Sequence, residues 1–245
     1  MVRLIDNINE LDFLPADPYA ARISALAETY GTGYDFAMFW VQSVDEKSVA
    51  AVCRVDGNMT VCCVDGADYE ELAAFINAVG FLSLTSDFEV MKMLGYEPSK
   101  KSFTVEYKGG AALCGIEKTR DCDKKKIYDL LCGCGFELGD YNAFLADVCA
   151  RLNKGTADFA AIMHDGEPCA CAFALFKGKK SVLLGAVATN KNARGRGYAS
   201  ELVGTLAEEN YDKKVFLFCR NDSLADFYSK IGFEKAGCWA ICEKD

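Results

Sequence analysis

The chain has 245 residues, of which 51% are hydrophobic and 26% are charged, and its formal net charge is -9. This length allows one large domain or two small ones, and the composition is typical of globular proteins. The acidic balance argues against nucleic acid as a partner, because binding to a phosphate backbone needs a broad basic face. A small anion needs only a local basic pocket, so the charge does not exclude one.

The N-terminal stretch "MVRLIDN" lacks the charged segment and apolar core of a signal peptide, and no apolar run reaches membrane-spanning length. We therefore expect a cytoplasmic protein that has no membrane partner. The thirteen cysteines and the single histidine show no spacing typical of a zinc site. We expect reduced thiols and no metal.

The first half of the chain predicts a strand, a hairpin, a helix, a strand, a short helix and a last strand. In chain order we expect these elements at 36–43, 48–64, 69–79, 81–86, 88–96 and 102–107. The hairpin is expected to turn at Gly57-Asn58. The following helix has apolar residues on one face, among them Leu72 and Ile76.

The second half predicts two opening helices and then the same order of elements. The helices are expected at 127–135 and 141–152, and the later elements at 158–165, 169–178, 181–190, 199–207, 214–220, 223–231 and 238–242. Both halves end their short helix with a glycine and an aromatic residue, Gly95-Tyr96 and Gly232-Phe233. We infer a duplication with a seam near residues 109–125, and domains at 1–109 and 110–245. The fold class is α/β (α+β), with a mixed, mostly antiparallel sheet flanked by helices in each domain.

A basic, glycine-rich loop lies between a strand and a helix in "NARGRGYASELV", residues 192–203. At a helix N-terminus, unpaired backbone N–H groups and the positive end of the dipole face outward. Gly195 and Gly197 allow a ligand to approach the backbone, and Arg194 and Arg196 add positive charge. Together these features predict a phosphate-binding site.

A dinucleotide-binding oxidoreductase is one reading of this loop, since Gly195-Arg196-Gly197 begins a GxGxx pattern. That fingerprint should follow its strand at once and open further βαβ units. Here the polar stretch 189–194 intervenes, and little chain follows. For this reason it is the weaker of two interpretations of the loop.

The loop resembles that of the GCN5-related N-acetyltransferases (GNAT superfamily), whose pattern (Q/R)-x-x-G-x-(G/A) is matched by Arg194, Gly197 and Ala199. The segment after the next strand resembles the family's N-x-x-x-A-x-x-x-Y-x-x-x-G-F pattern. Its matching residues are Asn221, Ala225, Tyr228, Gly232 and Phe233. The resemblance covers residues 158–242, and the end of the chain is most similar to the FR47-like branch of the family. The first half shares only the order of elements.

This resemblance implies transfer of an acyl group, usually acetyl from acetyl-CoA, to a primary amine of a small molecule by direct attack in a ternary complex. It implies that the cofactor pyrophosphate lies on the loop, that pantetheine lies beside residues 186–188, where Gly185 suits a β-bulge, and that Asn221 contacts the cofactor arm. Tyr228 would be the general acid and the backbone N–H of Val187 the oxyanion donor. The implied cofactor-binding residues are Ala186, Val187, Ala188, Arg194, Gly195, Arg196, Gly197, Tyr198, Ala199, Ser200 and Asn221.

Several roles stay open at this stage. The Tyr228 ring is also compatible with packing in the core, and Asn221 with capping a helix. No general base is evident, so we expect the attacking amine to lose its proton through water. Glu137 and Asp140 lie between the opening helices, a region that borders the acceptor in the family, and His164 is expected to be structural.

The first half of the chain has no counterpart of the basic, glycine-rich loop at residues 192–203. Its corresponding segment, "VDGADYEEL" at 64–72, carries acidic side chains that repel phosphate, and Met91 stands where Tyr228 stands in the second half. We expect a degenerate domain that binds no coenzyme A. A non-catalytic acyl-CoA-binding or sensory protein is the alternative function. The acidic balance favours a cationic acceptor such as a polyamine or an aminoglycoside.

Overall fold

The computed structural model describes residues 1–244. Its first half contains β1 (Val2–Leu4), η1 (Ile8–Leu11), α1 (Pro18–Tyr30), β2 (Ala37–Val44), β3 (Lys47–Val55), β4 (Asn58–Cys63), α2 (Tyr69–Val79), β5 (Ser83–Asp87), α3 (Phe88–Met93) and β6 (Lys100–Tyr107). Its second half contains α4 (Lys124–Gly133), α5 (Tyr141–Lys154), β7 (Asp158–His164), β8 (Glu167–Lys177), β9 (Ser181–Thr189), η2 (Lys191–Ala193), α6 (Tyr198–Glu208), β10 (Lys214–Phe218), α7 (Asp222–Ser229) and β11 (Phe233–Glu243).

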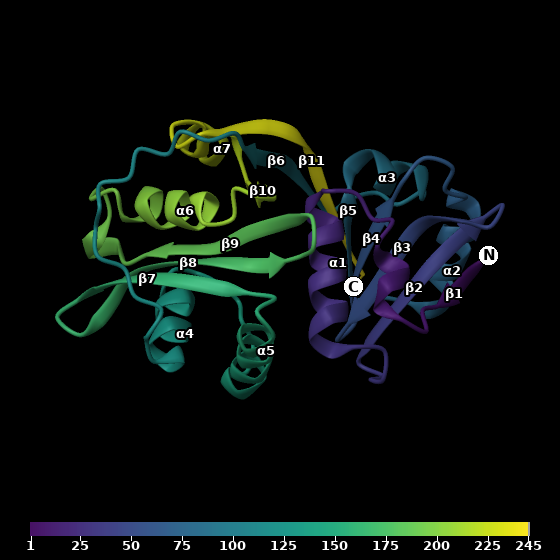
Figure 1. The fold of residues 1–245 in the computed structure, drawn as a ribbon, viewed down its shortest axis with the longest axis horizontal. Helices are drawn as coiled ribbons and strands as arrows, with labels where there is room; N and C mark the ends of the chain where they lie inside the picture. Colours follow the sequence, from purple (N-terminus) through teal and green to yellow (C-terminus); the bar gives the residue numbers. More distant parts are fainter. Residues whose placement is uncertain (245) are drawn as a thin grey trace.

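The strands form one mixed sheet in the order β1-β2-β3-β4-β5-β11-β6-β10-β9-β8-β7. Neighbouring strands are antiparallel except for β4 with β5 and β9 with β10, which are parallel. Helices cover the sheet on both faces, as Figure 1 shows. The predicted fold class, a mixed and mostly antiparallel sheet flanked by helices, is therefore confirmed, but the two halves share one continuous sheet where one sheet in each domain was expected.

The two halves exchange strands at the centre of the sheet. The last strand, β11, lies between β5 and β6, and β6 lies between β11 and β10. Each half thus fills a position in the sheet of the other half. Apart from β1 at one edge, the order of strands is the same when read outward from the central pair in either direction. Figure 1 shows this pair joining the two parts of the molecule.

Helix α1, which the sequence analysis did not predict, stands between the two halves (Figure 1). Asp17 caps it, accepting a hydrogen bond from the backbone N–H of Ala20 at 2.7 Å, and Pro18 occupies its first position. The fully buried Ala21 packs against Leu183 of β9 and Phe216 of β10. A helix of the first half therefore covers strands of the second.

The first hairpin turns one residue earlier than predicted. Asp56 and Gly57 have positive φ angles of 48° and 80°, and Asn58 already begins β4. Two consecutive residues at positive φ form the tight turn that matches the twist of antiparallel strands.

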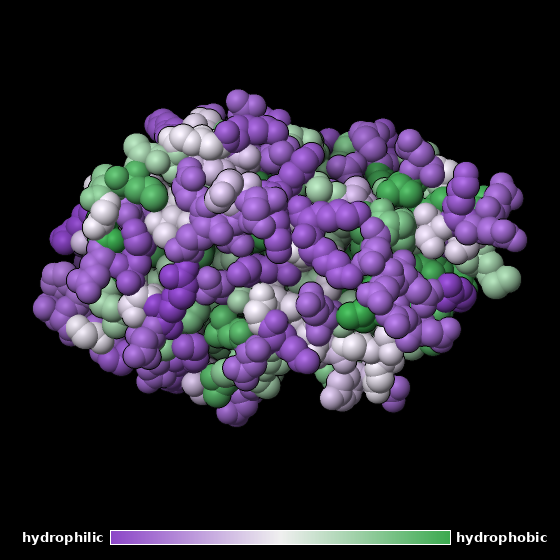
Figure 2. All heavy atoms as spheres, viewed as in Figure 1, coloured by the Kyte–Doolittle hydropathy of each residue, from purple (hydrophilic) through white to green (hydrophobic). Residues whose placement is uncertain are grey.

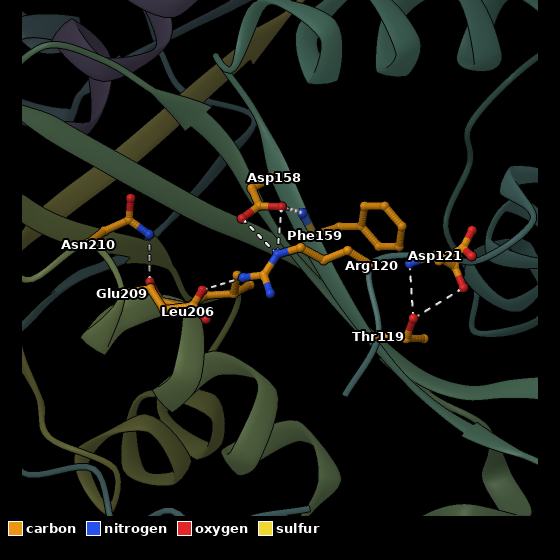
Figure 3. Close-up of polar contacts among 8 residues, drawn as sticks. All are labelled: Thr119, Arg120, Asp121, Asp158, Phe159, Leu206, Glu209 and Asn210. Atoms are coloured by element: carbon orange, nitrogen blue, oxygen red, sulfur yellow. Dashed lines mark hydrogen bonds and ion pairs between the residues drawn. The ribbon is translucent and has the colours of Figure 1, made fainter. Parts of the chain in front are cut away.

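The linker from residue 108 to 123 crosses α6 and β7 and is held there by polar contacts. Arg120 Nε donates to both carboxylate oxygens of Asp158 at 3.1 Å, and its guanidinium also pairs with Glu209 at the end of α6 (Figure 3). The carboxylate of Glu201, which is 2% exposed, accepts from the Cys114 N–H and from Lys118 Nζ, both at 2.6 Å. The linker is thus fixed to the second half.

Polar side chains cover most of the face drawn in Figure 2, with apolar side chains in small separate groups. No helix within residues 1–244 is long and apolar enough to cross a membrane.

Candidate functional site

The glycine-rich loop leaves the N-terminus of α6 open. Gly197 is the N-cap of this helix in the left-handed conformation, with φ of 78°, and no side chain caps the helix. The first hydrogen bond at this end runs from Glu201 N to Gly197 O at 2.9 Å, so the N–H groups of residues 198–200 precede it. A Cβ at Gly195 or Gly197 would meet no atom within 4 Å. Both glycines are needed for their backbone angles, and the space beside them is open.

A cavity of about 430 Å³ lies beside this helix terminus. Parallel pairing of β9 with β10 is confined to 181–184 and 214–217, and beyond Leu184 and Leu217 the two strands diverge. The cavity is lined there by Val187, Ala188 and Thr189 of β9, together with the loop and the start of α6. Diverging strands expose backbone groups that a ligand can pair with.

Strand β9 carries a bulge at this point. Cys171 and Phe173 of β8 pair with Ala188 and Gly185 of β9, so β9 has one extra residue between them. The residue at positive φ is Ala186, at 47°, and not Gly185. A Cβ at Gly185 would lie 2.5 Å from the end of the Leu175 side chain, so a larger residue here would require that side chain to move.

Tyr228 of α7 lines the same cavity and is 5% exposed. Its ring packs against Phe227 and Phe233, so it belongs to the core as well as to the cavity wall. Burial and, to a smaller extent, the neighbouring thiol of Cys219 raise the pKa of Tyr228 well above its usual range. The phenol is therefore protonated at neutral pH, which is the state that a general acid requires.

Most of the predicted cofactor residues come together on this cavity. Its wall contains Val187, Ala188, Arg194, Gly195, Gly197, Tyr198, Ala199 and Ser200. Three others lie elsewhere: Ala186 lines a cavity on the α4 and α5 side, Arg196 lines one beside His164, and Asn221 caps α7 by accepting from Leu224 N at 3.0 Å. The capping alternative for Asn221 is thus present in the structure.

The sequence analysis missed six residues of the cavity wall. They are Cys134, Phe136, Thr189, Ala193, Leu224 and Phe227. Cys134 and Phe136 belong to the loop between α4 and α5, which approaches from the other face of the sheet. Leu224 lies four residues before Tyr228 in the same helix, and this spacing was the available signal for it.

The acidic residues and the histidine considered as bases have separate places. Glu137 is exposed and lines the cavity that also contains Ala186. Asp140 caps α5, accepting from the N–H of Asn142 at 2.9 Å. His164, at the exposed end of β7, pairs with Asp165 at 3.0 Å. Within residues 1–244, no group of three or more His, Cys, Asp or Glu side chains is arranged to hold a metal ion.

The fold and this site define a class of protein. An open, basic helix terminus beside a bulged strand is the arrangement that the resemblance to the acetyltransferases implied. Residues 155–235 match the family model of the acetyltransferase (GNAT) domain. The second half of the chain therefore contains a GNAT acetyltransferase domain.

Solved structures of this family share the fold over the whole chain. A GNAT-family acetyltransferase from Colwellia psychrerythraea is 11% identical, with a TM-score of 0.55 and coverage of 100% of both chains. A tandem GNAT protein from the clavulanic acid biosynthesis pathway is 12% identical, with a TM-score of 0.57 and coverage of 98% of this chain and 97% of its own. A GCN5-related N-acetyltransferase from Kribbella flavida is 14% identical, with a TM-score of 0.59 and coverage of 91% and 92%. No curated protein gives a significant match.

Proposed function

We propose that the chain is an acyl-CoA-dependent N-acyltransferase that transfers acetyl from acetyl-CoA to a primary amine of a small molecule in the cytoplasm. The observation that carries this proposal is the uncapped N-terminus of α6, which opens onto the same cavity as Tyr228. A helix terminus with free N–H groups binds phosphate, and coenzyme A carries a pyrophosphate. Residues 110–245 would form the catalytic domain, and residues 1–109 a domain that binds no coenzyme A.

The reaction needs two groups of the chain and one neutral amine. The amine lone pair attacks the thioester carbonyl carbon, and the N–H of Val187 stabilises the negative charge on its oxygen. The C–N bond forms, the C–S bond breaks, and the leaving thiolate takes a proton from Tyr228. The amine gives up its own proton to water. The bulge at Ala186 turns the strand so that its backbone leaves the ladder here, which supports the role of Val187.

Thermal unfolding with acetyl-CoA and turnover with an amine panel test the proposal together. Saturation at about 100 times the dissociation constant stabilises the folded state by ~2.7 kcal/mol, a rise in Tm of roughly 5–10 °C for this length. Tyr228→Phe should keep this rise and lower kcat by about 100-fold, a typical contribution of acid catalysis. A rise without turnover of any amine would instead support the non-catalytic acyl-CoA-binding function.

A further inference from the structure

The cavity that contains Ala186 has a volume of about 380 Å³ and is built by both halves of the chain. It lies against the bulge of β9, on the face of the sheet that α4 and α5 cover. Its apolar wall contains Leu131, Leu138, Phe144, Phe173 and Leu175. Its rim includes two residues of the first half, Asp56 of the β3–β4 turn and Asn58 at the start of β4.

This second cavity shares a wall with the first. Ala186 lines the second cavity and Val187 lines the first. Likewise, Glu137 lines the second cavity and Phe136 lines the first. Because each pair consists of chain neighbours, the two cavities lie on two sides of the same backbone at β9 and at the α4–α5 loop. A group bound beside Val187 is therefore next to the second cavity.

Two carboxylates at the rim of the second cavity have no cationic partner among the residues of the described chain. Arg151, which is 8% exposed, already pairs with other residues. Its Nε donates to Asp147 at 3.0 Å, and its Nη1 donates to the carbonyl of Leu175 at 2.9 Å. Asp147 is thereby neutralised, and Tyr30 of α1 also donates to it at 2.5 Å. Asp56 and Glu137 are left as the uncompensated charges, one from each half.

We propose that the second cavity binds the acceptor and selects an aliphatic amine with a second ammonium group, which Asp56 and Glu137 hold; this rests on the acyltransferase function proposed above. The reacting nitrogen must lose its charge to attack, whereas a second nitrogen at the rim keeps its charge and pairs with the carboxylates. The apolar wall suits the methylene chain between the two nitrogens. The first half is thus part of the acceptor site.

Steady-state kinetics with 1,4-diaminobutane and butylamine test this proposal, because the two probes have the same chain and differ by one amino group. In wild type we expect a lower KM for the diamine. Asp56→Asn and Glu137→Gln should each raise that KM by about fivefold, the effect of a partly exposed ion pair. The KM for butylamine and kcat for both probes should stay within twofold.

Asp45→Asn is the matched control, because Asp45 is also exposed, lies in a hairpin turn of the first half and has φ of 48°. It should change neither KM. An equal KM for both probes in wild type, or an unchanged diamine KM in Asp56→Asn and Glu137→Gln, would overturn the acceptor assignment alone, since butylamine turnover keeps the acyltransferase function. If neither probe is turned over, calorimetric titration of each into the protein with saturating coenzyme A decides: equal affinities reject the assignment.

Discussion

Two helices at corresponding places in the two halves begin in opposite ways. Helix α2 follows β4 and α6 follows β9, but α2 is capped by Asp68, whose carboxylate accepts from the Glu71 N–H at 3.0 Å. Helix α6 begins at Gly197 and has no side-chain cap. An acid at a helix N-terminus satisfies its N–H groups and repels a phosphate, whereas a glycine leaves them free. One residue type at one position therefore separates a self-contained helix from a candidate ligand site.

The divergence of the parallel strands also differs between the halves. In the first half, β4 and β5 pair over 58–60 and 83–85, and a cavity of about 370 Å³ beyond that pairing is lined by Asp17, Asp87 and Glu106. Met91, fully buried in the core, stands where Tyr228 lines the cavity of the second half. The first half thus keeps the divergence of strands, with three carboxylates and one lysine, Lys214, on the cavity wall and an apolar side chain at the position of Tyr228. These observations support the expectation that it binds no coenzyme A.

Separating the halves should have the largest effect, because each one supplies a central strand to the other. Residues 110–245 expressed alone lack β6, so β10 and β11 lose a shared neighbour and expose unpaired backbone groups. We expect aggregation or loss of the cooperative unfolding transition, measured by circular dichroism. Co-expression with residues 1–109 should restore a folded complex. A monomeric, cooperatively unfolding fragment would show that the exchange is dispensable.

Gly197→Asp should place a carboxylate at the N-terminus of α6, as Asp68 does at α2, and so repel a phosphate there. We expect the acetyl-CoA-dependent rise in Tm, roughly 5–10 °C in wild type, to disappear. Gly197→Asn is the control, because asparagine tolerates the left-handed conformation and adds no charge. It should keep part of the rise. Equal rises in wild type and Gly197→Asp would place the cofactor elsewhere.

The linker has no counterpart in the first half, and Glu201 is its anchor. Burial alone would raise the pKa of Glu201, but Lys118 and the backbone N–H groups of Cys114 and Ile116 outweigh it, so the pKa lies below its usual range. Glu201→Gln should lower the stability at pH 7 by ~1–3 kcal/mol, since it removes a charged hydrogen bond. Because the pKa of Glu201 is lower in the folded state, this carboxylate stabilises the fold above the ordinary pKa of glutamate. That contribution is lost as the pH falls through the folded-state pKa. The difference in Tm between wild type and variant should therefore shrink in acid, and a difference independent of pH would contradict this account.

Asp68→Ala should have the smallest effect, because it removes one cap from the first half. The expected loss is ~1 kcal/mol, or a fall in Tm of roughly 2–4 °C. The acetyl-CoA-dependent rise should stay as in wild type, which differential scanning fluorimetry will show. A loss of that rise would mean that the first half takes part in cofactor binding.

Local patterns predicted most elements and the main cavity wall. The spacing of apolar residues identified α6, and the glycines at 195 and 197 identified its open terminus, because both signals lie within one turn of helix. Helix α1 was missed although Asp17-Pro18 is a helix-start signal.

The strand exchange and the second cavity could not be predicted from the sequence, for a different reason. The neighbours of β11 are residues 83–87 and 100–107, and no local pattern specifies which distant strands pair. Asp56 joins Glu137 at one cavity only because the first half docks beside α5.

The exchanged strands also set an order of events during synthesis. β11 begins 126 residues after β6 ends, so at ~5–20 residues per second it follows roughly 6–25 s later. Until then β5 and β6 lack the strand that separates them, and the early half waits on the ribosome with exposed edges. The nascent chain is accordingly most exposed to chaperones and proteases in this interval. Synonymous codon changes between residues 108 and 232 that slow translation should lower the yield of folded protein.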